Sequence, residues 1–207
     1  MDPYKQASMD AYDLHTSRFD AKFDEHFDES GQYFAREFAK IIIGKKVLDL
    51  GSGGGQYSLF FKERGLDVQC VDLSNEMIKL CMKKGLSTTQ GDMEEIQYDP
   101  HTFDGVWAYC SLLHLRREKI SPMIEKIARW LKPSGLFGLA LLNNNEPDGF
   151  RIEEKYPGTK RWFTYFTPSQ VEEMVRPYFD VISGSTKEVI GQSGNHYTFL
   201  NYLLKKR

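Results

Sequence analysis

The stretch VLDLGSGGG, Val47–Gly55, decides the fold class of this chain. A short apolar strand ends in Asp49 and Leu50, and four glycines follow within five residues. Glycines between a strand and a helix let the backbone approach a ligand closely, and the N–H groups of the helix N-terminus then point at that ligand. The stretch therefore predicts a ligand-binding loop at the carboxyl end of the first strand of an α/β fold.

Strand and helix patterns alternate from this loop to the end of the chain. Seven strands are expected, over residues 47–50, 67–72, 87–92, 103–110, 136–142, about 179–188 and 196–204. Four helices are expected between them, over 56–64, over 75–84, from Pro122 to a stop at Pro133 and Gly135, and over 168–178. The hairpin loop GQSGN joins the last two strands. This alternation predicts an α/β fold with a doubly wound, mostly parallel seven-stranded sheet and one antiparallel strand.

We expect one domain, residues 1–207, with three parts: an N-terminal helical cap over 1–43, a cofactor-binding core over 44–142, and a substrate loop, helix and hairpin over 143–207. In the cap, Phe19, Phe23 and Phe27 recur every four residues and predict one apolar stripe on a helix. A second cap helix is expected over 32–42. The polar loop over 143–166 is too long for a plain connector, so we expect it to contact a substrate.

Composition and charge exclude several classes of protein. The net charge of the chain is −2, so no overall field attracts it to nucleic acid or anionic lipid, although residues 1–30 contain eight acidic and three basic side chains. The three cysteines have no CxxC spacing, which fits a reducing compartment and predicts no metal site. No basic-then-apolar leader and no apolar run of the ~20 residues of a membrane span are present. We expect a cytoplasmic monomer or weak dimer without membrane association.

Acidic residues at the ends of the next two strands indicate a nucleoside ligand. Asp72, 21 residues after Gly51, can accept hydrogen bonds from both hydroxyls of a ribose, and Asp92 can accept one from an exocyclic amine such as adenine N6. The glycine spacing is G-x-G-x-G, because Gln56 occupies the third glycine position of the dinucleotide fingerprint. No G-K-[ST] sequence follows, which excludes a P-loop. These residues leave a nicotinamide cofactor and other nucleoside cofactors open.

Five motifs in order resemble those of a known enzyme family. They read VLDLGSGGGQYS, VDLSNEMI, QGDMEEI, FDGVWAYCSLLHL and IARWLKPSGLFGLALL. Together they resemble the class I S-adenosylmethionine-dependent methyltransferases, most closely the small single-domain members often labelled type 11, over about residues 10–204. The resemblance implies a Rossmann-like methyltransferase fold, S-adenosylmethionine as the cofactor, and a methyl-transfer activity.

The resemblance also implies which residues bind the cofactor. Asp49 and the glycine loop would hold its methionine end, Asp72 the ribose, and Asp92 the adenine amine. Tyr109 and Cys110 would form the wall near the sulfonium. The full set implied is Asp49, Gly51, Ser52, Gly53, Gly55, Asp72, Leu73, Met77, Asp92, Met93, Tyr109 and Cys110. Ordinary core positions are the alternative interpretation of Met77 and Met93.

A family pattern of Tyr-Asp, five residues and Tyr-Asp is nearly present in YDLHTSRFD, where Phe19 replaces the second tyrosine. Arg18, in the same segment, is a candidate contact for the cofactor carboxylate, with an ordinary surface arginine as the alternative. Substrate contacts are expected from aromatic and polar side chains of the cap, the fourth strand and the long loop, namely Tyr12, Phe19, His114, Trp162 and Phe163.

A general base is needed only if the acceptor loses a proton. His114 follows the fourth strand at the rim of the sheet where ligands bind in α/β folds, so it is the candidate base. Tyr109 and Tyr12 are candidate orienting hydroxyls. The alternative interpretation of His114 is a buried histidine hydrogen-bonded within the core.

The acceptor is expected to be a small molecule methylated on nitrogen, oxygen or sulfur. The segment WAYCS after the fourth strand lacks the prolines that nucleic-acid amino-methylating enzymes of this fold have there. RNA is the alternative acceptor, contacted through Lys155, Lys160 and Arg161. A nicotinamide-dependent oxidoreductase and a non-catalytic cofactor-binding protein are the remaining alternatives, and the motif series counts against the oxidoreductase.

Overall fold

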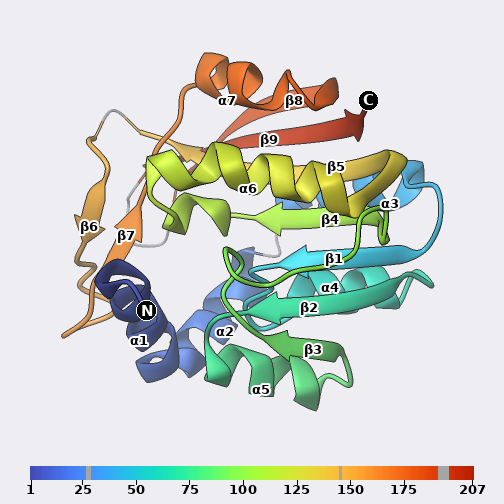
Figure 1. Ribbon diagram of the computed structural model, residues 1–207. Coiled ribbons are helices and arrows are strands. Elements are labelled where there is room, and N and C mark those ends of the chain that lie inside the picture. Colours follow the sequence, from blue (N-terminus) through green and yellow to red (C-terminus); the bar gives the residue numbers. More distant parts are fainter. Residues whose placement is uncertain (27–28, 145, 191–195) are drawn as a thin grey trace.

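One seven-stranded sheet forms the centre of the computed structural model, which describes residues 1–26, 29–144, 146–190 and 196–207 (Figure 1). The strands lie in the order β3 (Ser87–Gln90), β2 (Asp67–Asp72), β1 (Lys46–Leu50), β4 (Phe103–Tyr109), β5 (Leu131–Asn143), β9 (His196–Lys206) and β8 (Phe179–Ile190). Only β9 runs antiparallel to its neighbours, β5 and β8. The predicted doubly wound, mostly parallel sheet with one antiparallel strand is therefore confirmed.

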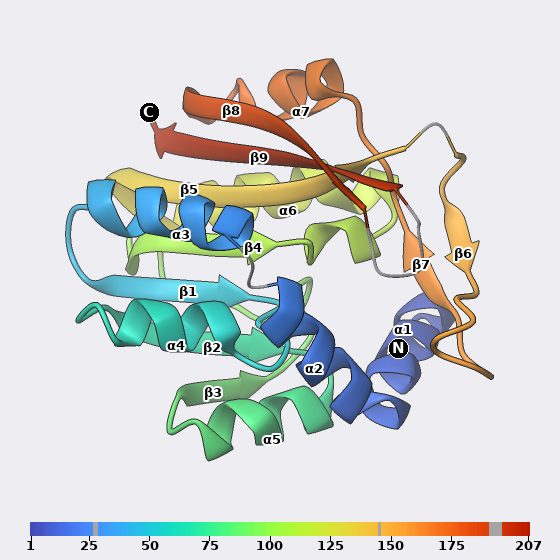
Figure 2. The same cartoon turned by 180° about the vertical axis from the view of Figure 1, so that it is seen from behind.

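Helices cover both faces of this sheet. They are α1 (Pro3–Leu14), α2 (Thr16–His26), α3 (Glu29–Ile41), α4 (Gln56–Lys62), α5 (Asn75–Lys83), α6 (Arg117–Trp130) and α7 (Pro168–Val175), with a short 3-10 turn η1 (Leu112–His114). Figure 1 shows α6 and α7 on one face, and Figure 2 shows α3 and α4 on the other. Helix α1 lies beyond the carboxyl ends of β1, β2 and β4, next to β7 (Figure 1). No helix among the described residues is long and apolar enough to cross a membrane.

Each face of the sheet buries its own apolar layer. The layer under α6 and α7 includes Leu48, Val106, Ile124, Trp130 and Phe137, and the layer under α3 and α4 includes Val47, Phe38, Phe61 and Trp107. Gly138 of β5 leaves room for Trp107, because a Cβ on this glycine would lie 2.3 Å from the indole ring. Burial on both faces explains why these strands read as continuous apolar runs.

The predicted start and end of α6 are wrong. The helix begins at Arg117, five residues before Pro122, which lies inside it and removes one backbone donor near its first turns. Ile120 and Met123, both buried, hold this part of the helix against the core. The helix ends at Trp130 rather than at Pro133, because Leu131 already has extended backbone and pairs with Phe103 as the start of β5.

The long loop is also more ordered than predicted. Strands β6 (Gly149–Arg151) and β7 (Arg161–Phe163) form a separate two-stranded antiparallel sheet. Strands of three residues are too short to show an alternating pattern. The capping box of Thr167 and Gln170 begins α7 as expected, but the helix ends at Val175 rather than at residue 178. The predicted GQSGN turn and Phe27 lie outside the described residues.

Candidate functional site

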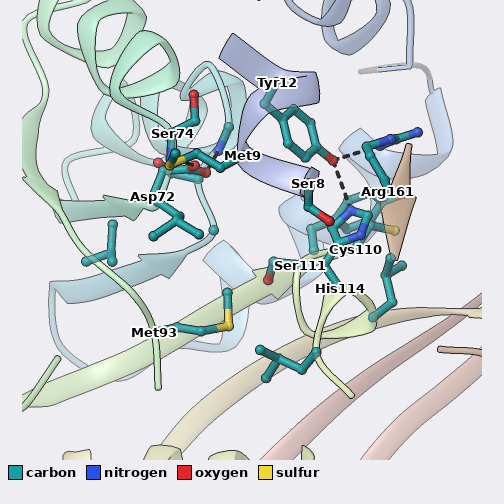
Figure 3. A pocket seen from close by; sticks show the side chains of 18 of the residues that line it. Ser8, Met9, Tyr12, Asp72, Ser74, Met93, Cys110, Ser111, His114 and Arg161 are labelled. Atoms are coloured by element: carbon teal, nitrogen blue, oxygen red, sulfur yellow. Dashed lines mark hydrogen bonds between the residues drawn. The ribbon is translucent and has the colours of Figure 1, made fainter. Parts of the chain in front are cut away.

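A pocket opens at the carboxyl ends of β1 and β4, where the chain leaves toward opposite sides of the sheet (Figure 3). Ligands of open α/β sheets bind at this kind of switch point. The roof of the pocket is α1, whose Lys5, Ser8, Met9 and Tyr12 line it at the spacing of one helix face. No cluster of three or more His, Cys, Asp or Glu side chains fit to hold a metal occurs in the part of the chain that the structure describes.

The glycine loop forms the floor of the pocket. Gly51, Ser52 and Gly53 line it, and both glycines have left-handed backbone, with φ of 76° and 53°. A Cβ on Gly51 would lie 2.3 Å from the Cβ of Ser111, so a side chain there would displace the β4 end of the pocket. Gly55 is not among the lining residues. Its φ of 80° at the start of α4 by itself favours glycine at this position.

Two carboxyl groups, the buried one of Asp49 and the half-buried one of Asp72, line the pocket at the ends of β1 and β2. Asp49 is 2% exposed, and its Oδ2 accepts a hydrogen bond from Ser58 Oγ at 2.6 Å. Burial, with a smaller contribution from the nearby Asp72, raises the pKa of Asp49 to about 7 against the lowering effect of the Ser58 hydrogen bond. Burial likewise raises the pKa of Asp72 to about 6, although Asp72 accepts backbone hydrogen bonds from Ser74 at 2.9 Å and Gly53 at 2.8 Å. Both groups would gain from a ligand that brings a positive charge or hydroxyl donors.

Asp92, beyond the end of β3, is hydrogen-bonded to helix α1. Its carboxylate accepts from Lys5 Nζ at 2.7 Å and from the backbone N–H of Glu94 at 2.9 Å. Lys5 also pairs with Glu94 at 2.8 Å, so one buried lysine of α1 joins two acidic residues at the pocket edge. Met93 and Leu73 also line the pocket.

Tyr12, His114 and Arg161 form a hydrogen-bonded row along one wall (Figure 3). Arg161 Nη1 donates to Tyr12 Oη at 2.8 Å, and Tyr12 Oη lies 2.9 Å from His114 Nε2. His114 Nδ1 lies 2.7 Å from the carbonyl oxygen of Trp162. Tyr109, Cys110 and Phe163 complete this side of the pocket, and Cys110 has left-handed backbone with φ of 55° directly after β4.

Three further predicted residues do not line the pocket. Met77 is fully buried and packs with Phe19 and Tyr156, in keeping with the core interpretation. Phe19 stacks on Tyr156 with ring centroids 4.0 Å apart and lies behind Tyr12. Trp162 contributes its backbone, which donates to Ser8 Oγ at 3.1 Å, while its ring packs against Tyr4. These side chains support the wall instead of forming its surface.

Three basic residues with predicted ligand contacts have partners within the chain. Arg161 is 6% exposed and pairs with Glu153, so it does not lie at the surface where a phosphate would reach it. Lys160 lies over the ring of Phe150 at 4.3 Å. Arg18 donates to the backbone carbonyl of Lys155 at 2.6 Å, which ties the cap to the loop after β6.

Sequence reasoning missed part of the pocket lining. The missed residues are Lys5, Ser8, Met9, Gln56, Tyr57, Val71, Ser74, Gly91, Ser111, Leu113, Leu115, Leu142, Glu153 and Phe199, and Arg161 is predicted only as a contact for RNA. The helical spacing of Lys5, Ser8 and Tyr12 could have indicated one shared face. Nothing local indicates that this face covers the glycine loop.

Comparisons with known proteins place the glycine loop in a recognised sequence family. Residues 47–135 match a family model described as a methyltransferase domain. The cypemycin N-terminal methyltransferase of a Streptomyces species is 30% identical over 169 residues, which cover 78% of this chain and 63% of that protein. The ubiquinone biosynthesis O-methyltransferase of Idiomarina loihiensis is 35% identical over 111 residues, which cover 50% of this chain and 45% of that protein. The chain thus spans about half the length of several curated relatives that it matches.

Solved structures share the whole fold. The 1,6-didemethyltoxoflavin-N1-methyltransferase of Burkholderia thailandensis, with bound 1,6-didemethyltoxoflavin and S-adenosylhomocysteine, has a TM-score of 0.70 at 23% identity. The alignment covers 100% of this chain and 91% of that one. A DhpI–SAH complex has a TM-score of 0.73 at 18% identity and covers 96% of each chain. At these sequence identities, the similarity of this chain to the two solved structures shows a shared fold alone.

Proposed function

We propose that the chain is a class I S-adenosylmethionine-dependent methyltransferase that transfers the methyl group of this cofactor to a nitrogen, oxygen or sulfur atom of a small molecule. The observation that carries the proposal is the pocket beneath α1, which the glycine loop and the hydrogen-bonded pair of Tyr12 and His114 line together. Residues 44–142 would bind the cofactor, and the cap with residues 143–207 would bind the acceptor.

The residues of the floor fit S-adenosylmethionine. Asp49, with Gly51 and Gly53, would hold the amino-acid end, because its buried carboxyl group has Ser58 as hydrogen-bond donor and gains from the ligand's positive charge. Asp72 would accept from the ribose hydroxyls, and Asp92 from the adenine amine. Leu73 and Met93 would contact the adenine ring.

The acceptor side of the pocket is mainly apolar. Tyr109, Phe163, Leu142 and Phe199 line it, and these walls suit a flat or apolar acceptor while they exclude water. The cofactor, when bound, supplies a methyl group already activated by the positive sulfonium. The chain therefore has to align the acceptor with that methyl group and to remove a proton where the acceptor has one to lose.

The Tyr12–His114 pair would take that proton. Tyr12 and His114 are hydrogen-bonded to each other in the pocket lining, whereas Tyr109, which also lines the pocket, packs its ring against Tyr57 with ring centroids 4.7 Å apart. The covered pocket and the burial of Arg161 favour a small acceptor over RNA, the alternative acceptor.

Two measurements test the proposal. Titration calorimetry with S-adenosylmethionine, S-adenosylhomocysteine and NAD should show binding of the first two, and binding of NAD alone would overturn the cofactor assignment. Incubation with methyl-labelled cofactor and a metabolite extract should then give a labelled product of low mass. Asp72→Ala serves as the matched control for uncatalysed methylation, and label found in RNA alone would refute the acceptor class.

A further inference from the structure

Arg161 lies in a cage of aromatic rings beside the pocket. Its guanidinium carbon is 4.9 Å from two ring centroids and 5.3 Å from two others, those of Phe19, Phe163, Tyr12 and Tyr156. Arg161 Nη2 pairs with the carboxylate of Glu153. A buried guanidinium between four rings and a carboxylate has one preferred position, because any other position would leave its charge without these partners.

The hydrogen bonds that start at Arg161 have a fixed direction. A guanidinium only donates, so Tyr12 Oη accepts from Arg161 at 2.8 Å. The carbonyl oxygen of Trp162 only accepts, so His114 Nδ1, 2.7 Å away, must bear a proton. In a neutral imidazole Nε2 is then an acceptor, and it accepts the hydroxyl proton of Tyr12 across 2.9 Å. The three hydrogen bonds therefore run in one direction: Arg161 donates to Tyr12, Tyr12 to His114, and His114 to the carbonyl oxygen of Trp162.

We propose that Tyr12 Oη, rather than His114 Nε2, takes the proton of the acceptor, and that Arg161 is the positioning residue that sets this order. The inference rests on the methyl transfer proposed above. The lone pair of His114 Nε2 already accepts from Tyr12, whereas a phenolic oxygen has two lone pairs, and Arg161 engages one of them.

Tyr12 and His114 together take up the proton that the acceptor loses. As the acceptor atom bonds to the methyl group, its bond to hydrogen breaks and the proton passes to Tyr12 Oη. The hydroxyl proton of Tyr12 passes at the same time to His114 Nε2. The sulfur that loses the methyl group keeps the bonding electron pair and becomes neutral, so the positive charge ends on His114.

The same contacts hold the charged product of this step. An imidazolium donates from both ring nitrogens, and His114 would then donate from Nδ1 to the Trp162 carbonyl and from Nε2 back to Tyr12 Oη. Neither ring has to turn. Glu153 keeps the charge of Arg161 paired, which limits repulsion between the two cations.

Nuclear magnetic resonance of the ¹⁵N-labelled full chain tests the direction of these hydrogen bonds and does not require methyl transfer. Long-range ¹H–¹⁵N spectra at alkaline pH should show His114 with Nδ1 protonated and Nε2 unprotonated. Tyr12→Phe should keep this tautomer and move the Nε2 signal, while the exposed His101 serves as the internal reference. An Nε2-protonated tautomer in the wild-type chain would overturn the proposal.

Kinetics with the acceptor found by the labelling screen test the role of Arg161. We expect Arg161→Met to lower kcat by about 10- to 100-fold, with unchanged affinity for S-adenosylmethionine and partial recovery in Arg161→Lys. Arg64→Met is the matched control, because Arg64 also packs on a ring, Phe60 at 3.4 Å, but is not among the pocket-lining residues. Unchanged kcat in Arg161→Met refutes the positioning role. A wild-type chain that binds the cofactor yet methylates nothing refutes the proposed function instead, and the tautomer still decides the direction of the row.

Discussion

Replacement of Asp49 by Asn should stabilise the ligand-free chain at neutral pH. Burial raises the pKa of Asp49 from 3.8 to about 7, so the fold favours the protonated carboxyl group. The stabilisation from that protonated form is complete below pH 3.8 and is lost as pH rises through about 7. A rise of this size in pKa corresponds to about 4 kcal/mol. Asn resembles the protonated group in shape and stays neutral, so the advantage of the variant should approach that upper limit above pH 7 and vanish near pH 4.

Urea unfolding of the wild type and of Asp49→Asn, without ligand and at several pH values between 4 and 8, measures the difference in their free energies of unfolding. Asp104→Asn is the control of opposite sign: burial raises the pKa of Asp104, but hydrogen bonds from Lys132 and the backbone N–H groups of Lys46 and Lys45 outweigh it and lower the pKa. Asp104→Asn should therefore be less stable than the wild type at pH 8. A stability difference between Asp49→Asn and the wild type that does not change with pH would refute the argument. Asp49→Asn should also bind S-adenosylmethionine more weakly.

Three further predictions concern the loop and the wall of the pocket. Asp72→Ala should weaken binding of S-adenosylmethionine by about 1.5–3 kcal/mol in calorimetry, and unchanged affinity in a folded variant would remove Asp72 from the site. Gly55→Ala should lower the free energy of unfolding by about 2 kcal/mol, because its backbone φ is +80° and its Cβ would lie 2.7 Å from Leu86. Gly65→Ala, with φ of +81° and nothing within 4 Å of its Cβ, should cost about half as much, and equal losses would contradict the packing argument. His114→Gln should slow methyl transfer by about 100-fold without loss of cofactor affinity, so an equal loss of affinity would argue for a structural role.

The order and type of the sheet elements could be predicted because their signals are local. Strands β1, β2 and β4 are short apolar runs between glycine or acidic residues, and alternation with helices predicts parallel pairing. The start of α6 could not be predicted, since a proline most often opens a helix and Pro122 lies within one. Strands β6 and β7 pair three residues each across a loop, and so few residues have no detectable period.

The site, too, contains residues that local signals predict and residues that depend on long-range packing. Asp49, Asp72 and Asp92 end successive strands or their connections, so their meeting at one edge of the sheet follows from the parallel fold. The contact of Arg161 with Tyr12 joins residues 149 positions apart and depends on how α1 packs on β7. No pattern within either segment determines that packing, which is why the sequence predicts Arg161 only as a contact for RNA.

The roof of the pocket has a further consequence for the order of folding. Lys5 meets Asp92 across 87 positions and Ser8 meets Trp162 across 154, whereas neighbouring strands β1 and β2 pair across about 20. Because closing long loops costs more chain entropy, α1 should dock after β1, β2 and β4 have paired. An element that docks last through a few buried side chains can also detach alone. We therefore expect hydrogen exchange in α1 to be faster than in the central strands, and ligand entry to require local release of α1 while the sheet stays folded.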